Sequence, residues 1–222
     1  MSSLHAGFEL KRSGTGVLTI GKEIGYDESH LDQYGFDLGE KNCRVMLINP
    51  PVSFDVFYGE WDLSDVKSSS PPLGILSLAA LIRKYGYQVD VVDAHADNMS
   101  LEQIKDRVRQ FQPHVVGTTA MTVMISAASE ILRVVKEVNP EIITIAGGVH
   151  LTAEPTKTLH RYPQIDFGTV GEGELAFLDF LDRLTKQKDM RDSESLVWRD
   201  DHGELHSNTR RRFFKSLDEF PP

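Results

Sequence analysis

Short apolar runs alternate with longer amphipathic stretches from residue 44 to residue 187. The runs are rich in valine and isoleucine and contain few polar positions, which is typical of strands covered on both faces in a parallel sheet. Five such strands are predicted, at Arg44–Asn49, Tyr87–Asp93, His114–Gly117, Ile142–Ile145 and Asp166–Val170.

The stretches between these strands predict helices, because their apolar residues recur at helical spacing. The first helix is expected to begin at Ser70, a plausible N-cap followed by Pro71, and to end at Gly86. The second begins at a capping box, Ser100–Gln103, and ends at Pro113. Further helices are expected at 125–138, at 155–162 and after the turn 171–174.

This alternation predicts the α/β fold class. We expect a flavodoxin-like or Rossmann-like sheet of five parallel strands in three layers, with strand order 2-1-3-4-5. The α/β domain is predicted to span 44–187. Residues 1–43 are interpreted as an N-terminal appendage with a small hairpin at 8–12 and 17–20. Residues 188–222 are interpreted as a second hairpin, at 196–199 and 204–206, and a linker toward another domain, because the chain ends in Phe-Pro-Pro.

Composition narrows the possible partners. The net charge of −9 argues against a general nucleic-acid or anionic-membrane surface. No apolar run approaches the roughly 20 residues that span a bilayer, and the first residues lack an apolar signal core, so we expect a cytoplasmic protein. The single cysteine, Cys43, excludes an intrachain disulfide and excludes a cysteine-ligated zinc or iron–sulfur site built by this chain alone.

The candidate site begins with two adjacent glycines, Gly147 and Gly148, which follow the fourth predicted strand. Ligands of open α/β sheets bind at the carboxyl ends of the strands. Without Cβ atoms, the glycine pair allows a flat or bulky ligand to lie against the backbone; an ordinary strand-to-helix turn is the alternative. Gly148→Leu separates the two, because it should block binding in the first case and harm folding in the second.

The other predicted strand ends are also rich in small residues, hydroxyls and glycines, which suits a broad ligand held by backbone and hydroxyl hydrogen bonds. A long loop, Val52–Ser70, adds four aromatic residues that suit a lid, a contact surface for another domain, or simple packing over the sheet. The predicted strand ends are Asn49-Pro50-Pro51, Asp93-Ala94-His95, Thr118–Thr122, Gly147–His150 and Gly171–Glu174.

Several standard sites do not fit these loops. No P-loop motif is present, and the first strand end lacks the acidic cluster of a phospho-acceptor receiver. The segment Gly171–Ala176 matches G-x-G-x-x-A, but Glu172 and Glu174 would repel a pyrophosphate. These glutamates would interact favourably with the helix dipole, or would accept hydrogen bonds from hydroxyl or amide groups of a ligand. His95 and His150 are candidate metal ligands or hydrogen-bonded loop residues.

Taken in order, the strand ends and the segments beside them resemble the N-terminal cobalamin-binding domain of cobalamin-dependent radical S-adenosylmethionine enzymes. The resemblance covers roughly residues 44–222. It rests on Asn49-Pro50-Pro51, Pro71-Pro72-Leu73-Gly74 with Ala79-Ala80-Leu81, Gly86-Tyr87-Gln88-Val89, Val92-Asp93-Ala94, Pro113–Gly117, Gly147–Ala153, Gly171–Glu174, the hairpin at Val197–Gly203 and the linker Leu217–Pro221.

The resemblance implies that cobalamin lies on the carboxyl edge of the sheet, with its lower face on the turns Thr118–Val123 and Gly147–His150. It implies a nucleotide tail that runs between helices toward Gly171–Glu174. In this family the cobalt often has no protein histidine below it. His95 stays a candidate ligand, because residues 93–98 approximate the D-x-H-x-x-G motif that supplies a cobalt-ligating histidine in some cobalamin proteins. The match departs from that motif in two ways, since it ends in Asn98 and follows the second strand, where the motif follows the first. The implied cofactor-binding residues are Pro51, Leu73, Gly74, Asp93, His95, Thr118, Thr119, Met121, Thr122, Val123, Gly147, Gly148, His150, Gly171, Glu172, Gly173 and Glu174.

The resemblance also implies methyl transfer or anaerobic cyclase-type chemistry on a small-molecule substrate, together with a radical S-adenosylmethionine domain in cis or in trans. Such a domain would hold S-adenosylmethionine and a [4Fe-4S] cluster, since this chain lacks the cluster cysteines. Whether the chain is part of an enzyme stays open. The alternatives are a non-catalytic cobalamin or tetrapyrrole sensor, a partner-docking module, and a degenerate domain that binds no cofactor.

Overall fold

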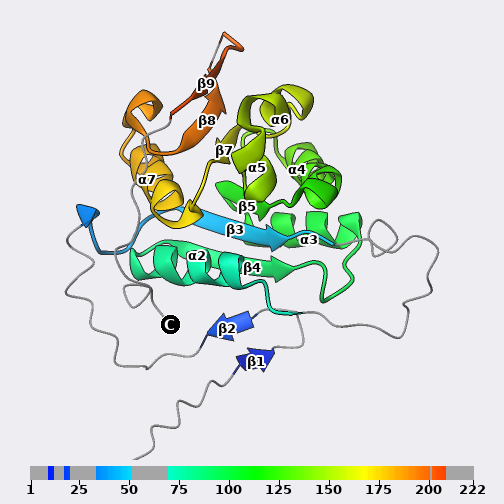
Figure 1. Ribbon diagram of the computed structural model, residues 1–222. Helices are drawn as coiled ribbons and strands as arrows, with labels where there is room; N and C mark the ends of the chain where they lie inside the picture. The colour runs from blue at the N-terminus through cyan, green and yellow to red at the C-terminus, as the bar shows by residue number, and fades with distance from the viewer. Residues whose placement is uncertain (1–9, 13–17, 21–33, 52–69, 201, 209–222) are drawn as a thin grey trace, which may run out of the picture.

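A single mixed sheet of seven strands organises the chain (Figure 1). The computed structural model describes residues 10–12, 18–20, 34–51, 70–200 and 202–208. Five strands of the sheet pair in parallel and stand in the predicted order 2-1-3-4-5, so the predicted α/β fold class and strand order are confirmed. These strands are β3 (Arg44–Asn49), β4 (Gln88–Asp93), β5 (Val115–Thr119), β6 (Ile143–Gly147) and β7 (Phe167–Thr169).

The predicted C-terminal hairpin continues the sheet. It consists of β8 (Leu196–Arg199) and β9 (Leu205–Ser207), and β8 pairs antiparallel with β7. Leu196 and Val197 are fully buried in this position. The hairpin is therefore an integral part of the sheet, whereas the sequence suggested a separate small appendage.

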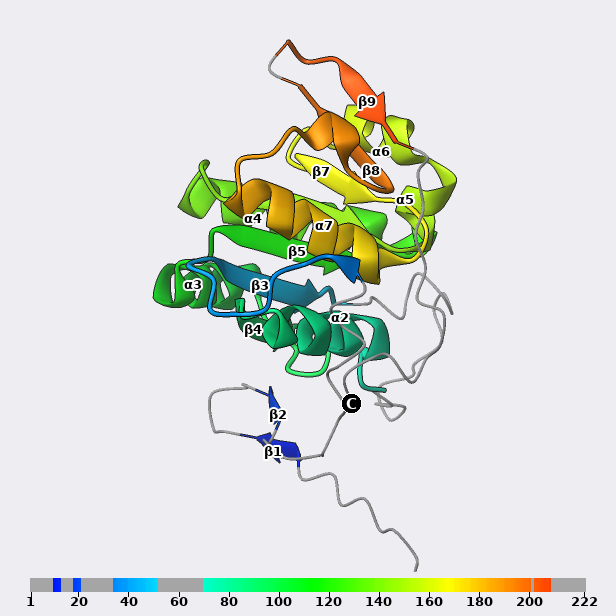
Figure 2. The same ribbon diagram turned by 90° about the vertical axis from the view of Figure 1, so that its left-hand side faces the viewer.

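Helices cover both faces of the sheet and complete the three predicted layers (Figures 1 and 2). One face carries α2 (Leu73–Lys84) and α7 (Gly173–Thr185), which contact each other. The other carries α3 (Leu101–Phe111), α4 (Ile125–Val138), α5 (Val149–Ala153) and α6 (Pro155–Arg161). Two short 3-10 helices, Thr122–Met124 and Met190–Asp192, lie in the connections.

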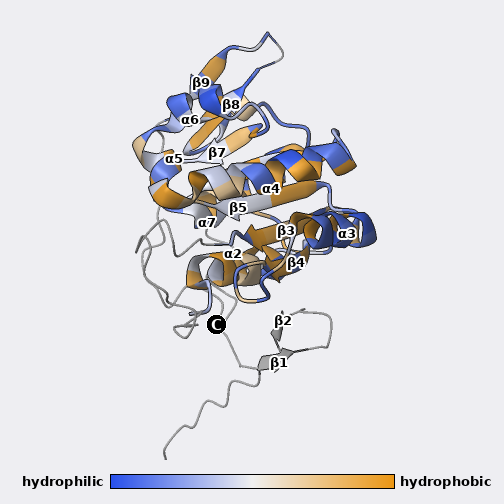
Figure 3. Cartoon of the chain, turned by 90° about the vertical axis from the view of Figure 1, so that its right-hand side faces the viewer, coloured by the Kyte–Doolittle hydropathy of each residue, from blue (hydrophilic) through white to orange (hydrophobic). Residues whose placement is uncertain are grey.

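The strands are apolar on both faces because each face packs against helices. In β3, Val45 and Leu47 belong to the core under α2 and α7, whereas Met46 and Ile48 belong to the core under α3 and α4. Figure 3 shows a mainly hydrophobic β3 and an α3 whose outward side is hydrophilic. Arg107 on α3 donates to both carboxylate oxygens of Asp90 on β4, each at 2.8 Å, and so ties this helix to the edge strand.

The helices differ from the sequence prediction in the start of α2 and in the presence of α5. The capping box is confirmed, because Ser100 Oγ accepts from the Gln103 backbone N–H and Gln103 Oε1 accepts from the Ser100 N–H. Ser70 does not cap α2, which begins at Leu73 with Pro72 as its N-cap residue and no side-chain cap. The short helix α5 was not expected.

Part of the N-terminal segment packs on the α2 side of the sheet. Tyr34 and Phe36 are buried in that core, and the Phe36 ring meets the Tyr85 ring edge-on at 5.9 Å between centroids. The earlier hairpin prediction is also confirmed, since β1 (Leu10–Arg12) pairs antiparallel with β2 (Leu18–Ile20). The domain division at residues 43 and 187 stays a prediction.

Among the described residues, no helix combines the length and the apolar character needed to cross a bilayer. Burial raises the pKa of the Cys43 thiol to about 11, so this side chain stays protonated and unreactive at neutral pH.

Candidate functional site

A cavity of about 170 Å³ lies between α2 and α7 at the carboxyl edge of the sheet. It stands at the topological switch point, because the helices that follow β3 and β5 lie on opposite faces and their loops diverge there. A cavity of roughly 150 Å³ holds a benzene-sized ring in a well-packed protein. This cavity therefore has room for an aromatic group of a ligand.

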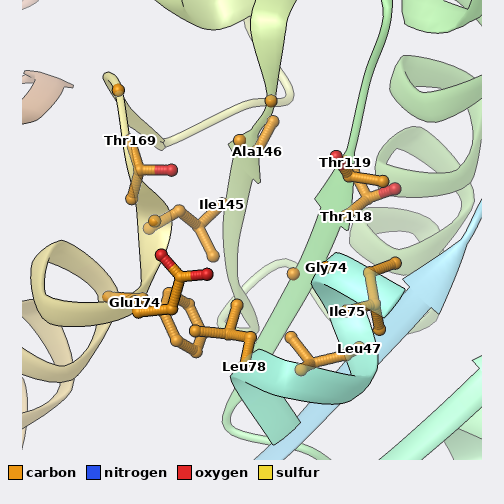
Figure 4. A pocket seen from close by; sticks show the side chains of 16 residues that line it. Leu47, Gly74, Ile75, Leu78, Thr118, Thr119, Ile145, Ala146, Thr169 and Glu174 are labelled. Atoms are coloured by element: carbon orange, nitrogen blue, oxygen red, sulfur yellow. The ribbon is translucent and has the colours of Figure 1, made fainter. Parts of the chain in front are cut away.

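The cavity walls are mostly apolar, and Figure 4 shows them from close by. Gly117 forms part of the floor in the middle of β5, where a Cβ atom would lie 2.8 Å from Leu47 Cδ2. Gly74, in the first turn of α2, has no heavy atom within 4 Å of the position that its Cβ would take. The apolar side chains of the walls are Leu47, Ile75, Leu78, Ile145, Ala146 and Phe177.

A few polar groups also line the cavity. The side chains of Thr119, Thr169 and Glu174 line it from β5, β7 and α7. The hydroxyl of Thr118 has a structural partner, since its Oγ1 donates to the Ile48 carbonyl at 2.9 Å. Three polar groups in an otherwise apolar cavity are a common arrangement in small-molecule sites, where they fix the orientation of the ligand.

Glu174 has the most perturbed environment of the three. Burial is the main cause that raises the pKa of its carboxyl group, and the charge of Glu172 raises it further. The hydrogen bond from its own backbone N–H lowers the pKa. In Figure 4 the carboxyl group points into the cavity beside Ile145 and Leu78.

The glycine pair joins two loops of the edge. The Ala120 N–H donates to the Gly147 carbonyl at 2.9 Å, and the His150 N–H donates to the Ala120 carbonyl at 3.1 Å. Gly148 has φ +97°, and a Cβ atom there would lie 2.8 Å from both the Ala120 carbonyl oxygen and Thr119 Oγ1. The backbone conformation at position 148 therefore requires glycine, and Gly148→Leu would destabilise the fold as well as hinder ligand binding.

Exposed apolar side chains surround the cavity at the same edge. Leu73 is 74% exposed at the start of α2, and Val149 is 66% exposed at the start of α5. Met121 and Val123 are 47% and 45% exposed in the turn after β5. Of the described residues, only Leu38 is a further large apolar side chain with comparable exposure. An apolar rim of this kind favours a broad, partly apolar ligand.

Eight predicted residues line the cavity, and the structure brings them together from four loops and helix starts. Among the described residues they are Gly74, Thr118, Thr119, Gly147, Gly148, Gly171, Gly173 and Glu174.

The other nine predicted residues lie outside the cavity. Leu73, Met121 and Val123 form its exposed rim, and Glu172 is exposed. Asp93 accepts hydrogen bonds from Asn49 Nδ2 and the Ala96 N–H, so its carboxylate stabilises the turn after the edge strand β4. His95 lies in that same turn. His150 Nδ1 pairs with Thr122 Oγ1 at 3.2 Å. Pro51 is half-buried after β3, and the aromatic loop that follows it lies outside the described residues.

Sequence reasoning missed the apolar walls. Leu78 and Ile145 were taken as ordinary core positions, because a cavity wall and a core face have the same periodicity. Gly117 carried a usable signal, since a glycine inside a strand often marks a close approach of a ligand or another backbone. Thr169 and Phe177 carried none.

The fold and the site define a doubly wound α/β domain with a ligand-sized cavity at the carboxyl edge of its sheet. Comparison with known proteins agrees: the B12-binding domain model matches residues 62–181, which is more than half of the 222 residues. The chain belongs to the B12-binding domain family.

Two curated relatives and one solved structure show the likeness. An uncharacterized methyltransferase of Pyrococcus horikoshii is 28% identical over 181 residues, covering 82% of this chain and 38% of the relative. The anaerobic magnesium-protoporphyrin IX monomethyl ester cyclase of Rubrivivax gelatinosus is 33% identical over 130 residues, covering 58% of this chain and 23% of the relative. The cobalamin-dependent S-adenosylmethionine radical enzyme OxsB, solved with aqua-cobalamin and S-adenosylmethionine, shares the fold with a TM-score of 0.62 at 20% identity over 77% of this chain and 22% of OxsB.

These findings confirm the predicted resemblance to cobalamin-binding domains of radical S-adenosylmethionine enzymes. The chain spans less than half the length of each of these proteins.

The residues present fit cobalamin. A cobalamin molecule has a broad corrin ring with amide arms and a nucleotide tail that ends in an aromatic base. The apolar cavity and its small floor residue Gly117 accommodate an aromatic base. The apolar rim and the backbone of the two adjoining loops accommodate a broad ring.

Proposed function

We propose that this chain binds cobalamin at the carboxyl edge of its sheet, with the nucleotide tail in the cavity between α2 and α7 and the corrin ring over the rim. The single observation that carries the proposal is the cavity itself. Its lining is mostly apolar, and Gly117 on β5 and Gly74 on α2 leave space in its walls. It lies beside four exposed apolar side chains at the switch point of the fold.

This chain's own residues would bind and orient the cofactor. Leu47, Ile145 and Phe177 would hold the aromatic base, and the backbone near Gly147 would face the ring. Bound cobalamin supplies a cobalt centre that carries methyl groups or takes part in radical reactions.

The partner in such a reaction would be a radical S-adenosylmethionine domain in cis or in trans, acting on a small-molecule substrate. This proposal rests on the relatives, which are methyltransferases and a cyclase, and on the single cysteine of the chain, which cannot hold a [4Fe-4S] cluster alone. A cytoplasmic location remains a further prediction.

The test is direct binding of hydroxocobalamin. The purified chain is incubated with the cofactor and desalted, and its visible spectrum is compared with its protein content. Near-stoichiometric cobalamin in the protein fraction supports the proposal. A folded protein without retained colour, and without measurable affinity by equilibrium dialysis, contradicts it and favours a docking module or a domain that binds no cofactor.

A further inference from the structure

Glu174 is the one charged side chain among the described residues that line the cavity. It enters from the first turn of α7, and its carboxyl group points between Leu78 and Ile145 (Figure 4). Among the described residues, the only interaction that lowers its pKa is its own backbone N–H, whereas burial and Glu172 raise it. The carboxyl group thus has lost much of its hydration without gaining a basic partner.

The helix alone does not explain this placement. A carboxylate in the first turn of a helix is favourable because of the helix dipole. Glu172, the N-cap residue of the same helix, already provides a negative charge there and is exposed to solvent. Glu174 is a second, half-buried carboxyl group at the wall of an apolar cavity, and its partial loss of hydration is destabilising unless a ligand adds hydrogen bonds to the one from its own backbone N–H.

We propose that Glu174 is a specificity-determining residue, whose carboxyl group forms a hydrogen bond with the nucleoside part of the cobalamin tail. The inference rests on the proposed function and deepens it. The phosphate of the tail is excluded as the partner, because like charges repel. The ribose hydroxyls remain as partners, because they can donate to a carboxylate, whereas the free ring nitrogen of the neutral base only accepts. The hydroxyls of Thr119 and Thr169 line the same cavity.

The consequence is selection of the complete cofactor. Corrinoids that lack the nucleotide, such as cobinamide, leave Glu174 without its partner and gain nothing from the cavity. Wild-type protein should therefore bind hydroxocobalamin more tightly than cobinamide.

The experiment compares both corrinoids on three variants by absorbance titration. Glu174→Ala should weaken hydroxocobalamin binding roughly 10-fold to 100-fold, the range of one hydrogen bond to a charged group. It should leave cobinamide binding unchanged. Glu174→Gln should keep most of the affinity for hydroxocobalamin, because an amide still hydrogen-bonds. Glu172→Ala, the matched control, should change neither. The isolated nucleoside α-ribazole should show saturation-transfer NMR signals with wild-type protein and lose them with Glu174→Ala.

The outcomes separate the two claims. If wild-type protein binds neither corrinoid, the proposed function fails and this inference fails with it. If wild-type protein binds hydroxocobalamin and Glu174→Ala binds it equally well, only the inference is overturned. An equal loss for both corrinoids also overturns it, because Glu174 would then act on the ring or on the fold. Removing the carboxyl group relieves its desolvation, so Glu174→Ala is expected to stay folded.

Discussion

Glycine positions keep the cavity open from two sides. Gly117 leaves space above the middle of β5, between Leu47 and Ile145 on the neighbouring strands. Gly74 lines the cavity at the start of α2, and the space that its Cβ atom would take is open. The two positions differ in tolerance, because a Cβ atom at 117 would press on Leu47 and one at 74 would meet nothing.

Gly74→Leu should therefore fill the cavity without harming the fold. We expect the affinity for hydroxocobalamin to fall by at least about 10-fold, and the stability to stay equal or rise, since glycine is roughly 1 kcal/mol less favourable than alanine in a helix. Titration and urea unfolding measure the two effects. Arg83→Leu, which adds the same side chain on the exposed last turn of α2, is the control and should leave binding intact. If Gly74→Leu bound hydroxocobalamin as tightly as wild type, the nucleotide tail of cobalamin would not lie in this cavity.

Gly148 should behave differently. Gly148→Ala forces a Cβ atom onto a backbone with φ +97°, and that atom would lie 2.8 Å from the Ala120 carbonyl oxygen. We expect a loss of about 1–3 kcal/mol in the free energy of unfolding, measured by urea denaturation. Ser126→Ala on the exposed surface of α4 serves as the neutral reference. A Gly148→Ala protein with wild-type stability would refute the assigned backbone conformation.

Glu174 should make stability depend on pH. Burial, and secondarily Glu172, raises the pKa of Glu174 in the folded state above its usual value of 4.5. Its contribution to stability is therefore fully present below 4.5 and is lost as the pH rises through the folded-state pKa. Glu174→Gln should be more stable than wild type at neutral pH, with a difference that shrinks as the pH falls toward 4.5.

Urea unfolding of both proteins across this pH range measures the difference. Glu172→Gln controls for the removal of one negative charge. A Glu174→Gln protein that is less stable than wild type at neutral pH would contradict the statement that burial destabilises the charged carboxylate.

The residue-level predictions from the sequence succeeded where glycines and hydroxyls followed strands, as at Gly147 and Thr119. They failed for Asp93, whose carboxylate organises its own turn, because an acidic residue at a strand end looks the same whether it binds a ligand or caps a loop. They also missed walls such as Phe177, since the sequence does not show that α2 and α7 leave a gap between them.

At the scale of elements, the hairpin β8–β9 protects the edge of β7. Leu196 and Val197 are fully buried there, and Trp198 stacks on His206 at 5.2 Å between ring centroids. A chain truncated after Gln187 would expose β7 and the apolar surfaces that β8 covers. We expect the truncated chain to lose cooperative urea unfolding, measured by circular dichroism. Cooperative unfolding at the wild-type midpoint would instead support a domain that ends at residue 187.

Element types could be predicted better than their ends. The capping box at Ser100 could be predicted from the sequence, because its two hydrogen bonds join residues that are three apart in the chain. The start of α2 was not, since two prolines and no side-chain cap precede Leu73. The integration of the hairpin into the sheet depends on the pairing of β8 with β7, which links distant parts of the fold that no local pattern specifies.

At the scale of the whole molecule, binding and folding are coupled. A ligand that binds only the folded state stabilises it, by about 2.7 kcal/mol at a free concentration 100 times the dissociation constant. Hydroxocobalamin should therefore raise the unfolding midpoint of the wild-type chain, and raise that of Gly74→Leu less at the same concentration. Equal shifts for both proteins would mean that the cofactor does not use the cavity.

Amide hydrogen exchange with and without hydroxocobalamin tests directly whether the cofactor occupies the cavity between α2 and α7. Bound cobalamin should slow exchange in four segments at the carboxyl edge: the start of α2, the turn after β5, the turn after β6, and the start of α7. A second hollow at the opposite edge, lined by Asn42, His114 and Asn139, is an internal control and should not change. Protection confined to that opposite edge, or bound cofactor with no protection of α2 and α7, would show that cobalamin does not occupy the cavity.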